Sequence, residues 1–305
     1  MDHRDRSRGC LLGLAVGDAV GTSVEFSPRG TFEPLTDMVG GGPFGLQPGQ
    51  WTDDTSMGLC LATSLVERSG FDAQDQMERY VRWADHGYLS STGSCFDIGN
   101  TVASALIRFK QSGDAFAGSV DPRTAGNGSI MRLAPIPLFY FPDVDATERY
   151  AAQSSRTTHA APECLDACRL MARMIYRGLA GDSKDELLFG DCETFSGAPK
   201  IVAIARGDYR KKAATEIRGS GYVVESLEAA LWCFLRTESY RDAVLLAANL
   251  GDDADTTAAI CGQLAGAHYG VAAIPQGWLE RLAMRVEIRQ LADQLAGRQG
   301  VEIQA

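Results

Sequence analysis

Apolar residues recur along most of the chain at intervals of three and four positions, the spacing of one face of an α-helix. Convincing runs of strict apolar and polar alternation, which would indicate half-buried β-strands, are absent from the sequence. The pattern therefore predicts an all-α protein built from amphipathic helices. The predicted helices cover residues 8–21, 55–68, 74–86, 97–111, 147–154, 162–179, 210–217, 223–236, 240–249, 256–270 and 277–296.

Small residues mark two of the predicted helices as central. Gly9, Gly13, Gly17 and Gly21 fall at four-residue intervals, so they line one face of the first helix. Each glycine costs up to about 1 kcal/mol relative to alanine in a helix, and close approach of a neighbouring helix would compensate. The helix that begins at Thr256 predicts a second tightly packed central helix, because it is equally rich in small residues. These residues are Ala258, Ala259, Gly262, Ala265 and Gly266.

Segments rich in glycine and proline mark the loops at 40–49, 126–129 and 181–199, and none resembles a flexible interdomain linker. At 305 residues with 45% hydrophobic content, the chain is long enough to bury a large core as one domain or two. The sequence shows neither an internal repeat nor a low-complexity tract. We therefore expect residues 1–305 to form one compact domain, an orthogonal multi-helix bundle.

The formal net charge of −10 argues against a nucleic-acid or anionic-membrane partner, because either would be repelled. An anionic ligand would have to be held locally, by a metal ion or by backbone N–H groups. No stretch approaches the roughly 18–20 uninterrupted apolar residues of a membrane span. The apolar run 10–16 superficially resembles a signal peptide, but Asp18 interrupts it and no clean cleavage site follows.

The eight cysteines are scattered without the spacing of a zinc site, and several lie in apolar helical stretches. This distribution favours reduced core thiols and a cytoplasmic location. The cysteines are Cys10, Cys60, Cys95, Cys164, Cys168, Cys192, Cys233 and Cys261.

Two carboxylate clusters, Thr52-Asp53-Asp54-Thr55 and Asp252-Asp253-Ala254-Asp255-Thr256, each lie between a glycine-containing loop and a predicted helix. N-capping of those helices is the simpler interpretation, but capping needs only one side-chain oxygen per helix. Adjacent carboxylates also repel each other unless a cation lies between them. The clusters therefore predict a shared hard-cation site, with Mg²⁺ or Mn²⁺ favoured over zinc and room for two ions. An EF-hand is excluded, because Ala258 stands where its loop requires glycine.

Other candidates have both a structural and a functional interpretation. Glu25 is either a surface glutamate or a cleft residue, and Asp97 is either a helix cap or an acid/base group. The glycines of the turn at 126–132 leave backbone N–H groups free for an anion, although the turn lacks the lysine of a P-loop. Arg132 is expected either to contact a phosphate or to form a structural ion pair. His159 is more often structural than functional in such a setting.

The segments that carry these candidates occur together. They are Gly17-Asp18-Ala19 with Glu25, Trp51-Thr52-Asp53-Asp54-Thr55, Asp97-Ile98-Gly99-Asn100, Gly126-Asn127-Gly128-Ser129-Ile130-Met131-Arg132, Thr158-His159 and Gly251-Asp252-Asp253-Ala254-Asp255-Thr256. As a set they resemble the ADP-ribosylglycohydrolase family, most closely its dinitrogenase reductase-activating type. They run in the family's order from about residue 9 to residue 270, and the combination is highly specific.

The resemblance implies a compact all-α fold with a cleft that holds two Mg²⁺ or Mn²⁺ ions. Matched residue by residue, the metal ligands would be Thr52, Asp53, Asp54, Asp253, Asp255 and Thr256. The catalytic groups would be Glu25, Asp54 and Asp97. The substrate contacts would be Asn100, Gly126, Asn127, Gly128, Ser129, His159 and Tyr222. Asp252 stands where many relatives have glycine, so we expect it to point outward or to lie behind the ligands.

The leading hypothesis is metal-dependent hydrolysis of the N-glycosidic bond between ADP-ribose and an arginine of a protein. The partners would then be an ADP-ribosylated protein and the released ADP-ribose, and we expect a monomer. One alternative is hydrolysis of an O-linked (serine) ADP-ribose or of a free ADP-ribose derivative. A second alternative is a non-catalytic ADP-ribose-binding relative, which has no need to keep so many carboxylates together.

Overall fold

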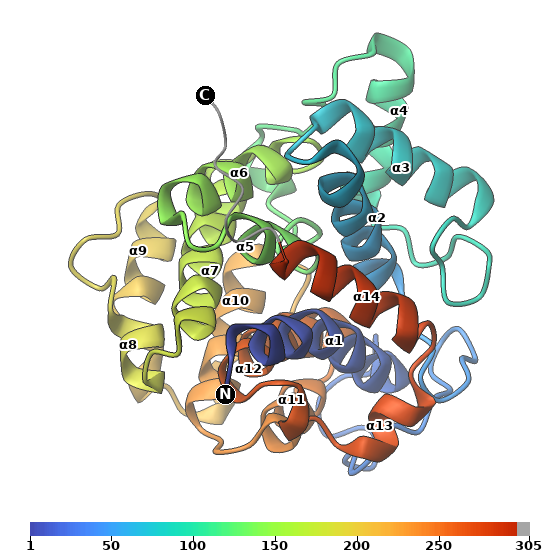
Figure 1. Cartoon of the computed structure of the whole chain (residues 1–305). Helices are drawn as coiled ribbons and strands as arrows, with labels where there is room; N and C mark the ends of the chain where they lie inside the picture. Colours follow the sequence, from blue (N-terminus) through green and yellow to red (C-terminus); the bar gives the residue numbers. More distant parts are fainter. Residues whose placement is uncertain (298–305) are drawn as a thin grey trace.

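The computed structural model describes residues 1–297 as α-helices joined by loops and short 3₁₀ turns (Figure 1). Within that range isolated bridges replace strands, which confirms the predicted all-α class. The α-helices are α1 (His3–Gly21), α2 (Asp53–Arg68), α3 (Ala73–His86), α4 (Asn100–Ser112), α5 (Pro135–Tyr140), α6 (Val144–Arg156), α7 (Pro162–Ala180), α8 (Lys184–Phe189), α9 (Pro199–Ala205), α10 (Val223–Leu235), α11 (Tyr240–Ala248), α12 (Ala254–Tyr269), α13 (Gln276–Arg281) and α14 (Arg285–Ala296).

The structure differs from the predicted helices in several segments, and helices α5, α8 and α9 were not predicted. The helix expected at 210–217 is two 3₁₀ turns, Asp208–Lys211 and Ala214–Glu216, because the segment is too polar to bury one face. The helix expected at 277–296 is divided into α13 and α14, and Met284 between them has a left-handed φ of 51°. Helix α8 lies in the segment expected to be a loop. Its signal was a capping box, in which Ser183 and Glu186 satisfy each other's backbone N–H groups.

Helices α1 and α12 pack backbone against backbone, side by side in Figure 1. A Cβ atom at Gly13 would lie 2.4 Å from the Gly262 carbonyl oxygen, and one at Gly17 would lie 2.2 Å from that of Ala258. Gly9 meets Gly266 in the same way, so the two helices run antiparallel. The glycine stripe of the sequence therefore has the predicted role of admitting a second central helix.

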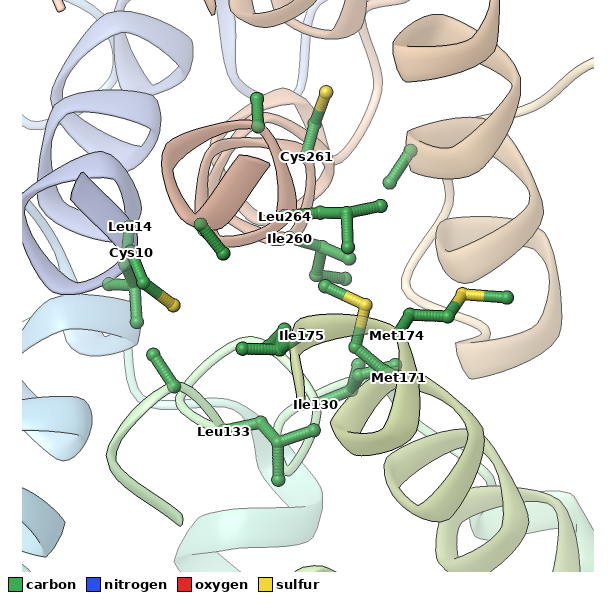
Figure 2. Packing of buried hydrophobic residues seen from close by; sticks show 14 of the residues in the cluster. Cys10, Leu14, Ile130, Leu133, Met171, Met174, Ile175, Ile260, Cys261 and Leu264 are labelled. Carbon is green, nitrogen blue, oxygen red and sulfur yellow. The ribbon is translucent and has the colours of Figure 1, made fainter. Parts of the chain in front are cut away.

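The main core surrounds α12. Figure 2 shows Leu14 of α1 on one side of α12, and Met171 and Ile175 of α7 beneath it. Ile260 and Leu264 of α12 point toward α7, and all five side chains are almost fully buried. This packing holds the N-terminus of α12 in a defined place, which matters because that end carries the second carboxylate cluster.

A second buried cluster lies between α2, α3 and α4. It contains Met57 of α2, Tyr80 and Trp83 of α3, and Leu106 of α4. The opposite face of α2, including Leu61, belongs to the main core. Helix α2 is thus packed against other helices on two faces. The loop that leads into α4 lies near the N-terminus of α2. The assignment of the whole chain to one domain stays a prediction.

None of the helices in residues 1–297 combines the length and apolarity that a membrane crossing requires. All eight cysteines are free thiols. Cys95 and Cys192 are half-buried and the others are buried, in agreement with the expected core thiols.

Candidate active site and metal centre

The antiparallel packing of α1 and α12 brings the two ends of the sequence to one place. Gly21, the last residue of α1, lies against Ala254, the first residue of α12. The chain that continues from α1 through a 3₁₀ turn to Glu25 therefore reaches Asp255. The N-terminus of α2 completes the site with Asp53 and Asp54. Two helix N-termini, each with a partial positive charge, thus face a common set of carboxylates.

Asp18 of α1 holds the first carboxylate cluster in place. Its Oδ1 accepts hydrogen bonds from the backbone N–H of Thr52 (2.9 Å) and from its hydroxyl (3.0 Å). Its Oδ2 accepts equivalent bonds from Thr55, at 3.0 and 2.6 Å. Asp18 is fully buried, and it is not among the site residues predicted from the sequence. The sequence feature that could have identified Asp18 is a carboxylate within a glycine-lined, otherwise apolar part of a helix.

The helix-capping interpretation does not account for the clusters. Thr52 and Asp253 occupy the N-cap positions of α2 and α12, but neither side chain makes a capping hydrogen bond. Instead the Thr52 hydroxyl donates to Asp255 Oδ2 (3.2 Å). The Thr256 hydroxyl donates in the opposite direction, to Asp54 Oδ2 (3.3 Å). The side chains of the two clusters therefore point at each other across the site.

Carboxylate oxygens converge closely enough to share a cation. Asp53, Asp54 and Asp255 each offer one oxygen, and these oxygens lie within 4.8 Å of one another. Glu25, Asp97 and Asp255 form a second such group, so Asp255 belongs to both. Asp54 Oδ1 and Asp255 Oδ1 are buried without a hydrogen-bond partner. Buried oxygens with free lone pairs fit hard divalent ions such as Mg²⁺ or Mn²⁺.

Asp253 stands at the edge of this arrangement. It is half-buried, and Asn127 Nδ2 donates to its Oδ2 at 2.5 Å. The predicted ligands Thr52, Asp53, Asp54, Asp255 and Thr256 therefore converge at the centre, and Asp253 joins them from the rim.

Burial and mutual repulsion make the ionised carboxylates unfavourable in the metal-free protein. Burial raises the pKa of Asp53, Asp54 and Asp255 well above the ordinary range, and neighbouring carboxylates raise it further. Burial together with Asp255 raises the pKa of Glu25 to about 12. Burial raises the pKa of Asp97 to about 7, although a hydrogen bond with Glu25 lowers it. A bound divalent cation would favour the ionised carboxylates and so lower these pKa values.

Asp97 lies in the loop before α4, and not in the helix expected from residue 97. Its φ is 57°, a left-handed value that is unusual outside glycine. Asn100, the first residue of α4, is exposed and lines the cleft. The strained loop thus aims Asp97 at Glu25 and leaves the N-terminus of α4 open to a ligand.

The turn at 126–129 forms one wall of the cleft, with the His159 ring behind it. A Cβ atom at Gly128 would lie 2.8 Å from His159 Cε1, so only glycine allows this contact. His159 Nδ1 is 2.8 Å from the Thr158 hydroxyl. Burial lowers the pKa of His159 to about 3, with the Arg132 charge lowering it further, so the ring is neutral at pH 7. Gly126, Asn127, Gly128 and His159 all line the cleft.

Arg132 takes neither of the roles considered for it. The fully buried guanidinium donates to the Gly128 carbonyl (2.7 Å) and to the Thr158 hydroxyl (2.8 Å). It also lies 4.7 Å from the centroid of the Tyr80 ring. These neutral partners show that Arg132 supports the turn from inside, and Arg132 is not part of the cleft lining.

Two other predicted substrate contacts lie away from the centre. The Ser129 hydroxyl accepts a hydrogen bond from Ser155 at 2.8 Å, behind the turn. Tyr222 lies outside the cleft lining, where its hydroxyl donates to Glu163 and accepts from Lys200 Nζ (2.8 Å). Their roles as substrate contacts stay predictions.

The cleft has a volume of about 750 Å³, within the range of nucleotide-sized ligand sites. Its lining includes residues that sequence analysis did not select. They are Phe26, Ile98, Gly99, Thr101, Val102, Met131, Ser220, Gly221 and Asp252. Most of these residues are close in the sequence to a predicted site residue, and that proximity is the sequence feature that could have identified them.

The fold and the site together define an all-α protein with a carboxylate-rich, cation-fitting centre at the base of a nucleotide-sized cleft. The chain belongs to the ADP-ribosylglycohydrolase family, whose profile matches residues 1–304. The family expected from the sequence motifs is therefore confirmed.

Two sequence relatives and one solved structure show how similar this chain is to individual proteins. The chain is 47% identical to ADP-ribosylarginine hydrolase Tri1 of Pseudomonas putida over 294 residues, which cover 96% of this chain and 78% of the relative. It is 33% identical to ADP-ribosyl-[dinitrogen reductase] glycohydrolase of Rhodospirillum rubrum, with 98% of both chains covered. The predicted likeness to the dinitrogenase reductase type is thus real but weaker than the likeness to Tri1. A solved structure titled ADP-ribosylglycohydrolase-related protein complex matches with a TM-score of 0.85 and 42% identity, covering 97% of this chain and 98% of its own.

Proposed function

We propose that this protein hydrolyses the N-glycosidic bond between ADP-ribose and an arginine side chain of a protein, releasing ADP-ribose. The observation that carries the proposal is the convergence of Asp53, Asp54 and Asp255, with buried unpaired oxygens, at the base of a nucleotide-sized cleft. Relatives named ADP-ribosylarginine hydrolase Tri1, at 47% and 44% identity, support the arginine linkage.

We propose that the site holds two Mg²⁺ or Mn²⁺ ions, because its donors are carboxylate and hydroxyl oxygens. The residues that would hold them are Thr52, Asp53, Asp54, Asp253, Asp255 and Thr256. When bound, such ions bind and polarise sugar hydroxyls and lower the pKa of a coordinated water. The Asp18 hydrogen bonds to Thr52 and Thr55 would fix the first cluster for this purpose.

Glu25 and Asp97 are the proposed proton-transfer pair. One carboxylate oxygen of each lies within 4.8 Å of the other, and burial raises the pKa of both groups, so the pair would hold a proton between them. That proton can pass to the leaving guanidine nitrogen as the glycosidic bond breaks, while a water oxygen bonds to the sugar C1″ atom and the water returns a proton to the pair. The bond breaks with positive charge developing at the sugar C1″ atom, and ionised carboxylates nearby stabilise that charge.

The glycine turn is the proposed wall for the ADP-ribose. Gly126 and Gly128 allow close approach of a ligand to the backbone, and Asn127 is fixed by its hydrogen bond to Asp253. His159 is neutral, so it can offer a hydrogen bond without a charge. Asn100 would contact the ligand from the opposite side.

The proposal is tested by measuring release of ADP-ribose from arginine-linked and serine-linked peptides, with Mn²⁺, with Mg²⁺ and with EDTA. We expect metal-dependent release from the arginine-linked peptide alone. Release from serine alone would move the enzyme to the O-linked class. No release despite bound Mn²⁺ in calorimetry would favour the non-catalytic relative.

Substitution of a ligand gives a sharper version of this test. Asp255→Ala removes a residue shared by both carboxylate groups, so turnover with Mn²⁺ should fall by about 100-fold or more. The fold should persist, because removing a buried charge also removes repulsion in the metal-free protein. Asp121→Ala, at a half-buried aspartate outside the cleft lining that forms a salt bridge with Arg123, is the matched control. Wild-type turnover in Asp255→Ala would contradict the assignment of the site.

We also propose a monomeric protein located in the cytoplasm. Light scattering coupled to size-exclusion chromatography tests the oligomeric state, and an elution mass of a dimer or larger species would contradict it.

A further inference from the structure

Phe26 and Asp252 stand side by side at the mouth of the cleft. The N–H of Phe26 donates to the Asp252 carbonyl at 2.7 Å, and the N–H of Asp252 donates to the Ser27 carbonyl at 2.8 Å. The Phe26 side chain is 64% exposed, and Asp252 is also exposed. Both residues line the cleft. Backbone hydrogen bonds thus hold two neighbouring residues at the cleft lining, one with an aromatic ring and one with a carboxylate.

The backbone at these two positions is left-handed. Phe26 has a φ of 61°, a value that is a rare exception for a bulky side chain, and Asp252 has a φ of 55°, which aspartate adopts more readily. Because Phe26 is largely exposed, burial of its apolar surface offsets little of the energetic cost of this backbone conformation. Strain of this kind persists where the surrounding structure enforces it, and it gathers at ligand sites.

The surrounding structure does enforce the conformation. A Cβ atom at Gly251 would lie 2.5 Å from the Ser27 carbonyl oxygen, so the two loops touch. The Arg29 guanidinium donates to the carbonyl oxygens of Ala214 (2.6 Å) and Ile217 (2.8 Å). The loop that presents Phe26 is therefore anchored on both sides, and the ring is held in place before any ligand arrives.

The mouth combines aromatic rings with uncompensated negative charge. The Phe26 ring lies 6.3 Å from that of Phe44, which lies 5.1 Å from that of Phe96, the residue before Asp97. Within residues 1–297, no lysine or arginine forms a salt bridge with Glu25, Asp97 or Asp252. An aromatic face beside the Asp252 carboxylate is complementary to a planar, weakly hydrated cation.

We propose that Phe26 and Asp252 form the subsite for the arginine side chain of the target protein. The Phe26 ring stacks on the guanidinium, and the Asp252 carboxylate accepts its hydrogen bonds. This inference rests on the proposed function, because a guanidinium enters the mouth only if arginine carries the ADP-ribose. A serine-linked substrate presents a neutral oxygen and gains nothing from either residue, so the pair would set the linkage specificity.

The test uses the Mn²⁺-loaded protein and its variants Phe26→Ala, Phe26→Tyr and Asp252→Asn. We expect the KM for ADP-ribosylarginine to rise roughly 3- to 30-fold in Phe26→Ala and in Asp252→Asn, the range that corresponds to a cation–π contact or one charged hydrogen bond. Phe26→Tyr keeps an aromatic ring and should stay within about 2-fold of the wild type.

Two binding measurements separate this role from general damage to the cleft. Agmatine, which carries the guanidinium without ADP-ribose, should inhibit the wild type competitively and lose that effect in Phe26→Ala and Asp252→Asn. The affinity for ADP-ribose in calorimetry should be unchanged in all three variants, because the ribose and adenine lie beyond the subsite.

The outcomes are distinguishable. An unchanged KM and unchanged agmatine inhibition in both Phe26→Ala and Asp252→Asn would overturn the subsite and leave the arginine linkage intact. An equal loss of ADP-ribose affinity would overturn it too, because the residues would then support the sugar site. A wild-type protein that releases nothing from arginine-linked peptides would overturn the proposed function, and the subsite with it.

Discussion

The Asp18 carboxylate is buried, yet both its oxygens accept hydrogen bonds from Thr52 and Thr55. Burial raises the pKa of Asp18 to about 6, while these hydrogen bonds lower it. The residue touches no cleft surface, so its contribution is the position of the α2 N-terminus. Asp53 and Asp54 are aimed at Asp255 because Asp18 fixes the residues on either side of them.

Replacing Asp18 with asparagine tests this positioning role. The amide NH₂ would face an N–H or O–H group of Thr52 or Thr55, which leaves buried donors unpaired. We expect a loss of about 1–3 kcal/mol in the free energy of unfolding and a fall of about 10- to 100-fold in Mn²⁺ affinity. Urea unfolding and calorimetry measure the two effects. Asp121→Asn, at a half-buried position outside the cleft lining, is the control, and unchanged Mn²⁺ affinity in Asp18→Asn would contradict the role.

At the scale of elements, the contact of α1 with α12 decides where the site forms. Backbone approach along Gly9, Gly13 and Gly17 sets the register of the two helices. Because the helices are antiparallel, this register brings the end of α1 to the start of α12. A shift along the contact would separate Glu25 from Asp255, so the glycine stripe supports both packing and chemistry.

Alanine at Gly13 and at Gly58 forms a matched pair. A Cβ atom at Gly13 would lie 2.4 Å from the Gly262 carbonyl oxygen, a backbone atom that cannot move alone. A Cβ atom at Gly58, inside α2, would have the flexible Leu14 Cδ1 atom as its nearest neighbour at 3.4 Å, with Arg132 Cα next at 3.9 Å, both ordinary van der Waals contacts. We expect Gly13→Ala to destabilise the protein by about 1–3 kcal/mol or more. Gly58→Ala should be neutral or stabilising by up to about 1 kcal/mol, because alanine favours a helix.

Urea unfolding of both variants measures the difference, with Mn²⁺ affinity as a second readout. Equal stability of the two variants would show that the α1–α12 contact relaxes easily, and that it does not set the register of the site.

At the scale of the whole molecule, the candidate metal ligands come from residues 52–54 and 253–256, about 200 positions apart in the chain. A cation bound to both clusters would therefore link the α2 end of the structure to the α12 end. Binding to the folded state alone stabilises that state, by about 2.7 kcal/mol at a free concentration of 100 times Kd.

This linkage predicts a pH-dependent stabilisation by Mn²⁺. Asp97 has a raised pKa of about 7 in the metal-free fold, compared with about 4 in the unfolded chain. Between these two pH values the folded protein keeps a proton on this group that the unfolded chain has lost. Its stabilising effect is complete below about pH 4 and is lost as the pH rises through the raised pKa. A cation competes with that proton, so the increase in Tm with Mn²⁺ over EDTA should be larger at pH 7.5 than at pH 5.

The Tm difference between Mn²⁺ and EDTA is taken at the same pH, so contributions from groups that titrate independently of the metal cancel. Burial lowers the pKa of His159 to about 3, so its neutral state destabilises the fold below about pH 6.5. Ion-paired Asp75 has a lowered pKa and loses its contribution only as the pH falls below about 4. Both effects are the same with and without metal. A Tm increase that is independent of pH would contradict metal binding at the raised-pKa carboxylates.

The helical class and most helix bounds followed from the sequence because apolar spacing is a local property. The errors occurred where local signals are weak or conflict. The segment 210–217 is short and polar, and α13 and α14 are divided by one left-handed residue, Met284. Arg132 was ambiguous because a charge in a sequence does not reveal whether it is buried, and only packing gave it neutral partners.

The sequence by itself determined the all-α class, the two small-residue helices, the carboxylate clusters and the family, since each depends on residue type and spacing. The tertiary structure alone decided the role of Asp18, the place of Ser129 behind the turn, and the pairing of Phe26 with Asp252. These features depend on which backbone segments meet, and that is set by helix packing between residues distant in the chain. Local spacing carries no information about such contacts until the helices have packed.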